Sequence, residues 1–175
     1  MTRPLRALPK ALALARLAGI RSTEATALGN LGTCHERLGN YAEAISLQEA
    51  SLTICQEIGN RDGESTALMN LGEAYLHSSR PDEALSCLRP ALIIARSTHG
   101  RYDEALVLTN LGKAMAALGH TVDAHAHFSE ALLIWRALDD PQARSVETLI
   151  ESLPLPASRR NRGGASRSTR GRRFR

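Results

Sequence analysis

The chain has 175 residues, of which 43% are apolar and only 3% aromatic. A core rich in alanine and leucine favours closely packed helices over a β-sandwich, and the sequence has no run of eighteen apolar residues that could span a membrane. The net charge of +4 is uneven, because residues 153–175 carry eight arginines and no acidic residue, while the remainder has 14 basic and 18 acidic residues.

A forty-residue repeat organises the chain. The segment LGNLG at 28–32 recurs as LMNLG at 68–72 and as LTNLG at 108–112, and such agreement at a fixed spacing indicates a solenoid of stacked units. The predicted order is a half repeat at 4–22 with a second helix only, repeats at 23–62, 63–102 and 103–141, a capping helix at 142–153, and a disordered arginine-rich tail at 154–175. The sequence therefore predicts an all-α protein.

Each repeat predicts two antiparallel helices. In the first helix, leucines recur at three- and four-residue spacing and form one apolar stripe. Gly32, Gly72 and Gly112 lie at the edge of that stripe, although a glycine inside a helix costs about 1 kcal/mol relative to alanine. We expect these glycines to allow a close helix crossing, with Ala44, Ala84 and Ala124 as the small residues that face them.

The combination of Leu-x-x-Leu-Gly, Tyr41, Glu43-Ala44 and Ser51-Leu52 resembles the tetratricopeptide repeat, in a variety with longer helices. The resemblance implies a right-handed α-solenoid that binds other proteins. The linker 59–64 and the segment 131–141 also resemble the C-terminal repeats of actinobacterial transcriptional regulators of the AfsR type. That second resemblance implies a part or fragment of a transcriptional regulator.

Three asparagines are the main candidate binding residues. Asn30, Asn70 and Asn110 point well away from the leucine stripe on a helical wheel, and an amide can both donate to and accept from a peptide backbone. The family resemblance implies that they bind a ligand on the concave face. A ladder of asparagines that joins neighbouring repeats is the structural alternative. The wheel neighbours predicted to complete the groove are Thr33, Arg37, Glu73, His77 and Lys113.

The sequence gives little support for an enzyme active site or a metal site. The sequence contains none of the G-x-x-x-x-G-K-[ST], G-x-S-x-G and H-E-x-x-H motifs, so we expect no enzyme activity and no cofactor. In the last repeat, His120, Asp123, His125 and His127 are the one cluster that resembles a metal site. Only Asp123 and His127 have the i, i+4 spacing of a helical metal pair, so we expect no metal site. The odd number of cysteines favours a reduced, cytoplasmic setting.

Three kinds of partner are therefore predicted. The main one is a protein or peptide in the concave groove. The half repeat at 4–22 is expected to expose apolar surface and to promote self-association. The arginine-rich tail offers an alternative function as a nucleic-acid-associated regulator, although it lacks aromatic residues for base stacking apart from Phe174. No membrane partner is expected.

Overall fold

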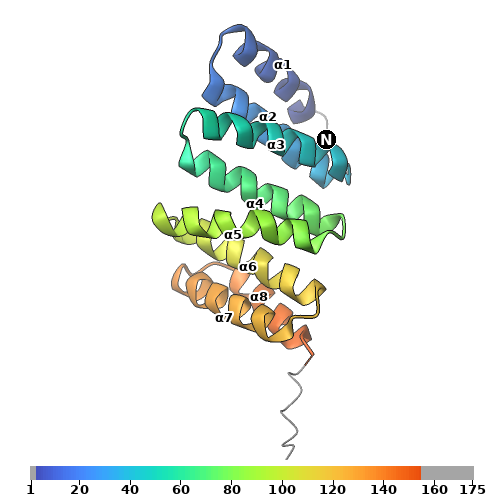
Figure 1. The fold of residues 1–175 in the computed structure, drawn as a ribbon, viewed down its shortest axis with the longest axis vertical. Helices are drawn as coiled ribbons and strands as arrows, with labels where there is room; N and C mark the ends of the chain where they lie inside the picture. Colours follow the sequence, from blue (N-terminus) through green and yellow to red (C-terminus); the bar gives the residue numbers. More distant parts are fainter. Residues whose placement is uncertain (1–2, 155–175) are drawn as a thin grey trace, which may run out of the picture.

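The computed structural model describes residues 3–154 and contains eight α-helices in that range and no strand (Figure 1). The arginine-rich tail predicted at 154–175 lies, apart from Pro154, outside the described residues. The helices are α1 (Arg3–Leu17), α2 (Arg21–Arg37), α3 (Tyr41–Glu57), α4 (Arg61–His77), α5 (Pro81–Ser97), α6 (Arg101–Ala117), α7 (Thr121–Ala137) and α8 (Gln142–Ser152). None of these helices is long and apolar enough to cross a bilayer.

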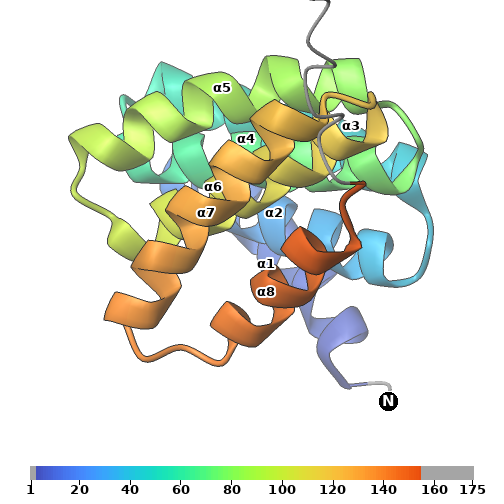
Figure 2. The same ribbon diagram turned by 90° about the horizontal axis from the view of Figure 1, so that it is seen from below.

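The helices form three antiparallel hairpins, α2–α3, α4–α5 and α6–α7, stacked one on the next. The single helices α1 and α8 pack on α2 and α7 at the two ends of the stack. The first helices of neighbouring hairpins also contact one another, α2 with α4 and α4 with α6. Figure 2 shows the stack from below. This arrangement confirms the predicted α-solenoid.

Every turn between helices uses one residue in the left-handed backbone conformation, which ends the preceding helix. In the turn after α2, for example, the Asn40 amide donates to the His35 carbonyl and the Gly39 amide donates to the Glu36 carbonyl. Glycine meets this requirement without strain, whereas other residues adopt it at a cost. The residues with positive φ are Gly19, Gly39, Gly59 and Gly119, together with Ser79, His99 and Asp139.

The repeated glycines mark the close crossing of the two helices in each hairpin, as predicted, but the facing side chains are different from those expected. A Cβ added at Gly72 would lie 2.5 Å from Leu88 Cγ, and one added at Gly112 would lie 2.5 Å from Phe128 Cδ1. The predicted partners Ala44, Ala84 and Ala124 are buried one helical turn earlier. Each glycine is therefore a hole that receives one larger side chain from the second helix.

Ion pairs join consecutive hairpins at their ends. The Glu24 carboxylate accepts hydrogen bonds from Arg16 (2.9 Å) and Arg21 (2.8 Å), and Glu104 accepts the matching bonds from Arg96 (2.9 Å) and Arg101 (2.7 Å). The hydrogen bond from Arg16 is the main reason that the pKa of Glu24 lies below its usual value. These pairs connect the end of a second helix to the start of the next first helix.

The glycine crossing gives a testable prediction. Gly112→Ala should lower the free energy of unfolding by about 1–3 kcal/mol, because the new methyl group overlaps the buried Phe128 ring. In the control Gly29→Ala, the added Cβ would lie 3.5 Å from Ser51 Oγ and 3.6 Å from Gln48 Oε1, which are ordinary contacts. That variant should keep or gain stability, by up to about 1 kcal/mol. Urea unfolding followed by circular dichroism measures both, and equal effects would contradict the assignment.

Candidate functional site

A pocket of about 190 Å³ lies between the first and second hairpins, where α2, α3 and α4 meet. Asn30 and Asn70 both line it, together with Thr26 and Thr66, so the two asparagines lie at one pocket. No hydrogen bond of either asparagine side chain occurs among the described residues, whereas both threonine hydroxyls donate to carbonyls of their own helices. The remaining lining residues are Ala25, Gly29, Gln48, Ser51, Cys55, Asn60, Gly63 and Ala67.

Gln48 forms one wall of this pocket and is only 2% exposed. Its amide Nε2 donates to the Gly29 carbonyl at 2.9 Å and lies 3.5 Å from the Thr33 hydroxyl. The Thr33 hydroxyl itself donates to the Gly29 carbonyl at 3.2 Å. Thr33, one of the predicted groove residues, is therefore hydrogen-bonded to its own helix and to Gln48.

The third asparagine has different surroundings. Asn110 is only 5% exposed, and its Oδ1 accepts a hydrogen bond from Lys113 Nζ at 3.1 Å. Of the three predicted asparagines, two thus have side chains without a hydrogen bond to the described residues, and one is buried and hydrogen-bonded within its own helix. The predicted alternative of a direct asparagine ladder has no hydrogen bond among the described residues to support it.

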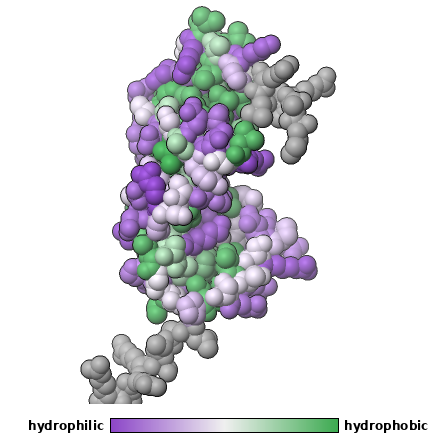
Figure 3. All heavy atoms as spheres, turned by 90° about the vertical axis from the view of Figure 1, so that its right-hand side faces the viewer, coloured by the Kyte–Doolittle hydropathy of each residue, from purple (hydrophilic) through white to green (hydrophobic). Residues whose placement is uncertain are grey.

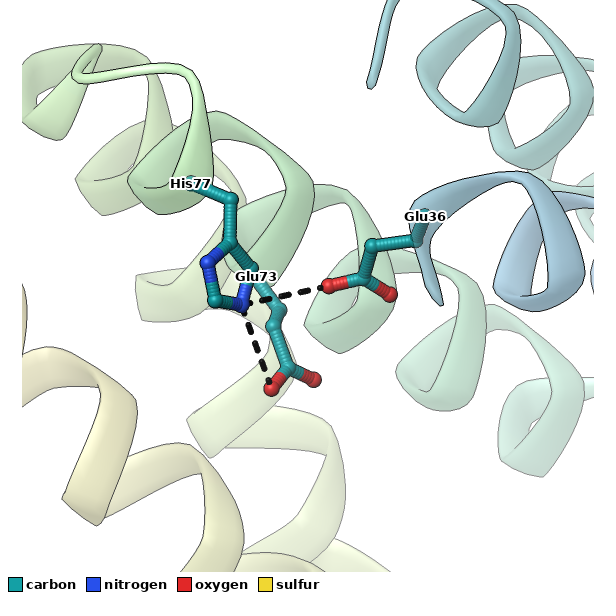
Figure 4. Close-up of side chains that lie close together, drawn as sticks. All are labelled: Glu36, Glu73 and His77. Atoms are coloured by element: carbon teal, nitrogen blue, oxygen red, sulfur yellow. Dashed lines mark ion pairs between the residues drawn. The ribbon is translucent and has the colours of Figure 1, made fainter. Parts of the chain in front are cut away.

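Two further predicted residues, Glu73 and His77, meet a residue that the sequence analysis did not identify. Figure 4 shows the His77 imidazole on α4 facing the carboxylates of Glu73 and of Glu36, which comes from α2. His77 Nε2 lies 3.5 Å from Glu36 Oε1 and 4.0 Å from Glu73 Oε1. The imidazole stacks on the Tyr41 ring, with 5.7 Å between ring centroids and 9° between planes. Arg37 lies exposed at the end of α2.

The environment of Glu36 makes its proton affinity unusual. Burial, and then the negative charge of Glu73, raise the pKa of Glu36 from 4.5 to about 7, against the opposing charges of Arg37 and Lys113. A buried carboxyl beside a second carboxylate favours a bound proton or another positive charge. Two carboxylates and an imidazole are also a ligand set that suits divalent metals such as zinc.

These three residues are the only such group within residues 3–154 whose possible metal-ligand atoms all lie within 4.8 Å of one another. The histidines and the aspartate of the last repeat, which the sequence analysis weighed as a metal pair, form no group of this kind in that range. Burial lowers the pKa of His127, and His125 lies 3.3 Å from the Ser129 hydroxyl.

The residues that the sequence analysis missed share one signal. Gln48 stands forty residues before Leu88 and eighty before Phe128, and Glu36 stands forty before Leu76 and eighty before Ala116. Each is a polar residue at a repeat position that is otherwise apolar. Such an exception in a repeat column would have been enough to single out both residues.

The pKa of Glu36 gives a prediction about stability. Because the carboxyl binds its proton more tightly in the folded chain, its contribution to stability is complete below pH 4.5 and is lost as the pH rises through about 7. Glu36→Gln should therefore have little effect at pH 4.5 and should raise the free energy of unfolding at pH 8 by about 1 kcal/mol, or about 2–4 °C in Tm. Thermal unfolding at both pH values tests this.

The matched variant Glu73→Gln removes the repulsion without touching Glu36. It should lower the pKa of Glu36, which carbon-detected NMR titration of the side-chain carboxyl reports. A Glu36 pKa near 4.5 in the unmodified protein would contradict the assigned environment.

Comparisons with known proteins agree with this architecture. The family model described as "Tetratricopeptide repeat" matches residues 23–89 and 63–137, which together span well over half of the chain. A search of curated proteins gives no significant match. The crystal structure of BtubC (BKLC) from P. vanneervenii aligns with a TM-score of 0.69 at 20% identity, over 82% of this chain and 61% of that chain. This chain thus covers less than two thirds of BtubC, and the likeness is one of fold. The family match and the stacked hairpins show that the chain belongs to the tetratricopeptide-repeat family.

Proposed function

We propose that the chain is a non-catalytic scaffold that binds an extended peptide or protein segment across α2 and α4. The observation that carries this proposal is the pair of amides of Asn30 and Asn70, which line one pocket and make no side-chain hydrogen bond within residues 3–154. Exposed or half-exposed amides on neighbouring rigid helices suit the alternating donors and acceptors of a peptide backbone.

The binding surface extends from this pocket along the two helices. Glu73 and His77 offer charge and hydrogen bonds near the end of α4, and Arg37 lies at the end of α2. Thr33 supports Gln48 from the side of the groove. Asn110 has a supporting role in this proposal, because its amide oxygen holds the Lys113 ammonium at the surface of α6.

A selection experiment tests the proposal. Peptides are selected from a random display library on the immobilised full chain. They should bind at least tenfold more weakly to the double variant Asn30→Ala/Asn70→Ala, because the peptide backbone loses the hydrogen bonds that the two asparagine side chains provide. The matched control is Asn40→Ala, which makes the same change at an exposed turn residue without a side-chain capping bond. Unchanged affinity in the double variant, with helicity intact, would refute the groove assignment.

Self-association is proposed for the N-terminal end of the stack. Leu14 and Leu17 of α1 are 66% and 85% exposed, and Ile20 in the following turn is 50% exposed. Hydrophobic side chains are also visible at this end of the molecule in Figure 3. Contiguous exposed apolar side chains favour association.

Sedimentation equilibrium tests this association. The full chain should sediment as a concentration-dependent oligomer, and the variant Leu14→Asp/Leu17→Asp should shift it to the monomer. Ile93→Asp, which places the same charge at an exposed apolar site on α5, should leave the association unchanged. A monomer at all concentrations would exclude the proposed contact.

The resemblance to AfsR-type regulators suggests a transcriptional role, and it rests on residues 59–64 and 131–141 alone. The alternative of nucleic-acid binding depends on the arginine-rich tail, which lies outside the described residues. Both remain hypotheses, and the peptide-binding proposal needs neither of them.

A further inference from the structure

One buried acceptor in the first hairpin lacks a hydrogen-bond partner. Gln48 Nε2 donates to the Gly29 carbonyl at 2.9 Å, and this bond fixes the orientation of the amide, since the reverse orientation would bring two oxygens together. Gln48 Oε1 is then buried without a partner among residues 3–154. A buried acceptor without a partner destabilises the fold, so its presence calls for an explanation.

In the other two hairpins, an apolar side chain fills the corresponding space at the helix crossing. Leu88 occupies the hole at Gly72, and Phe128 occupies the hole at Gly112, whereas Gln48 occupies the hole at Gly32. An apolar side chain is therefore compatible with this crossing. The glutamine is not required by the helix packing that the repeat imposes.

The pocket reaches this glutamine on the side of Gly29, where an added Cβ would lie 3.6 Å from Gln48 Oε1. Gly29 stands where the next repeats have Met69 and Thr109. In the third hairpin, Thr109 is buried and accepts a hydrogen bond from the Trp135 indole at 3.2 Å, while the first hairpin has Cys55 at the position of Trp135. The second hairpin has Ala95 at that position, so of these two positions only Gly29 is smaller than both of its equivalents.

The chemistry of the pocket selects an uncharged polar guest. None of the described residues that line it is aspartate, glutamate, lysine, arginine or histidine, and burial raises the pKa of the Cys55 thiol, which stays neutral. A charged side chain would lose its hydration there without a counter-charge. The Ser51 hydroxyl donates to the Ala25 carbonyl at 2.9 Å and is thereby used as a donor. The pocket is therefore lined by Gln48, whose Oε1 has no donor among residues 3–154, and by Asn30 and Asn70, whose side-chain amides can both donate and accept hydrogen bonds.

We propose that this pocket is a specificity site for a primary amide, the side chain of a glutamine or asparagine in the bound peptide. Gln48 Oε1 is buried in the structure, so the Gln48 side chain shifts toward the pocket as the guest enters beside Gly29 and then accepts from the guest NH₂. The guest carbonyl accepts from Asn30 or Asn70. A hydroxyl can also donate and accept, but only through a single oxygen atom, whereas a primary amide carries its donor and its acceptor on two separate atoms. An aliphatic side chain offers neither. This inference rests on the proposed peptide-binding function and names the side chain that the site prefers.

Short peptides test the preference directly. The probes are acetyl-Ala-Ser-X-Ser-Ala-N-methylamide peptides with X as Gln, Asn, Met, Glu, Lys or Ser, and the N-methylamide cap leaves X as the only possible primary amide. Titration of the ¹⁵N-labelled full chain, followed at the Gln48 side-chain and Gly29 backbone amides, gives Kd. The Gln or Asn peptide should bind about five- to tenfold more tightly than the Met and Glu peptides, as expected for one net hydrogen bond.

Two variants use the repeat's own residues to remove the site without disturbing the fold. Gln48→Leu copies the second hairpin and deletes the acceptor, and Gly29→Ala narrows the pocket beside Gln48 Oε1 with a methyl group that clashes with nothing. Both should bind all peptides with equal affinity, and Gly29→Ala should do so at unchanged or higher thermal stability. The control Thr53→Ala, on the exposed side of α3, should keep the preference for the amide.

The outcomes separate this inference from the proposed function. Equal binding of the Gln and Met peptides to the unmodified chain, or an amide preference that survives in Gly29→Ala, would overturn the specificity site. Neither result affects the library selection with the Asn30 and Asn70 variants, which tests peptide binding itself. If no peptide shifts the Gln48 or Gly29 signals at millimolar concentration, the specificity site is wrong even where the library yields binders elsewhere in the groove.

Discussion

The insertion of one side chain into a glycine hole is the contact on which each hairpin depends. Gly32, Gly72 and Gly112 let the second helix cross closely, and the residue at the crossing is Gln48, Leu88 or Phe128 in turn. Because close packing leaves little tolerance for added volume, the three crossings share one geometry. The left-handed turns then reverse the chain, so that similar hairpins stack into a solenoid whose first helices contact one another.

That constraint also explains why the first hairpin differs chemically from the others. Once a side chain must occupy the hole, a glutamine placed there has its nitrogen on the Gly29 carbonyl and its oxygen buried. The pocket beside it lies where Gly29 stands in place of the Met69 and Thr109 of the other two hairpins. The ion pairs at the hairpin ends, such as Arg16 with Glu24, join one hairpin to the next without entering the groove. The ion pairs and the pocket thus lie in separate parts of the repeat, whereas Gln48 belongs both to the helix crossing and to the pocket lining.

Most of the fold could be predicted from the sequence periodicity, because a solenoid repeats one local arrangement and each repeat packs against the repeats next to it in sequence. The hairpin order, the glycine crossings and the stop signals at Gly39 and Gly119 were all readable in this way. The facing residue was misidentified, since Ala44 and its equivalents are merely small, whereas the hole is filled one turn later by Gln48. Side-chain direction along a helix decides that detail, and spacing alone does not reveal it.

The sequence by itself determined the helical class, the repeat, and the face on which Asn30 and Asn70 lie, because these depend on the 3.6-residue period of one helix. Only the tertiary structure decided how residues from different helices combine. It buried Asn110, brought Glu36 of α2 to Glu73 and His77 of α4, and left Gln48 Oε1 without a partner among residues 3–154. These outcomes depend on distances between helices, which are set by packing volume and which no pattern within a single helix contains.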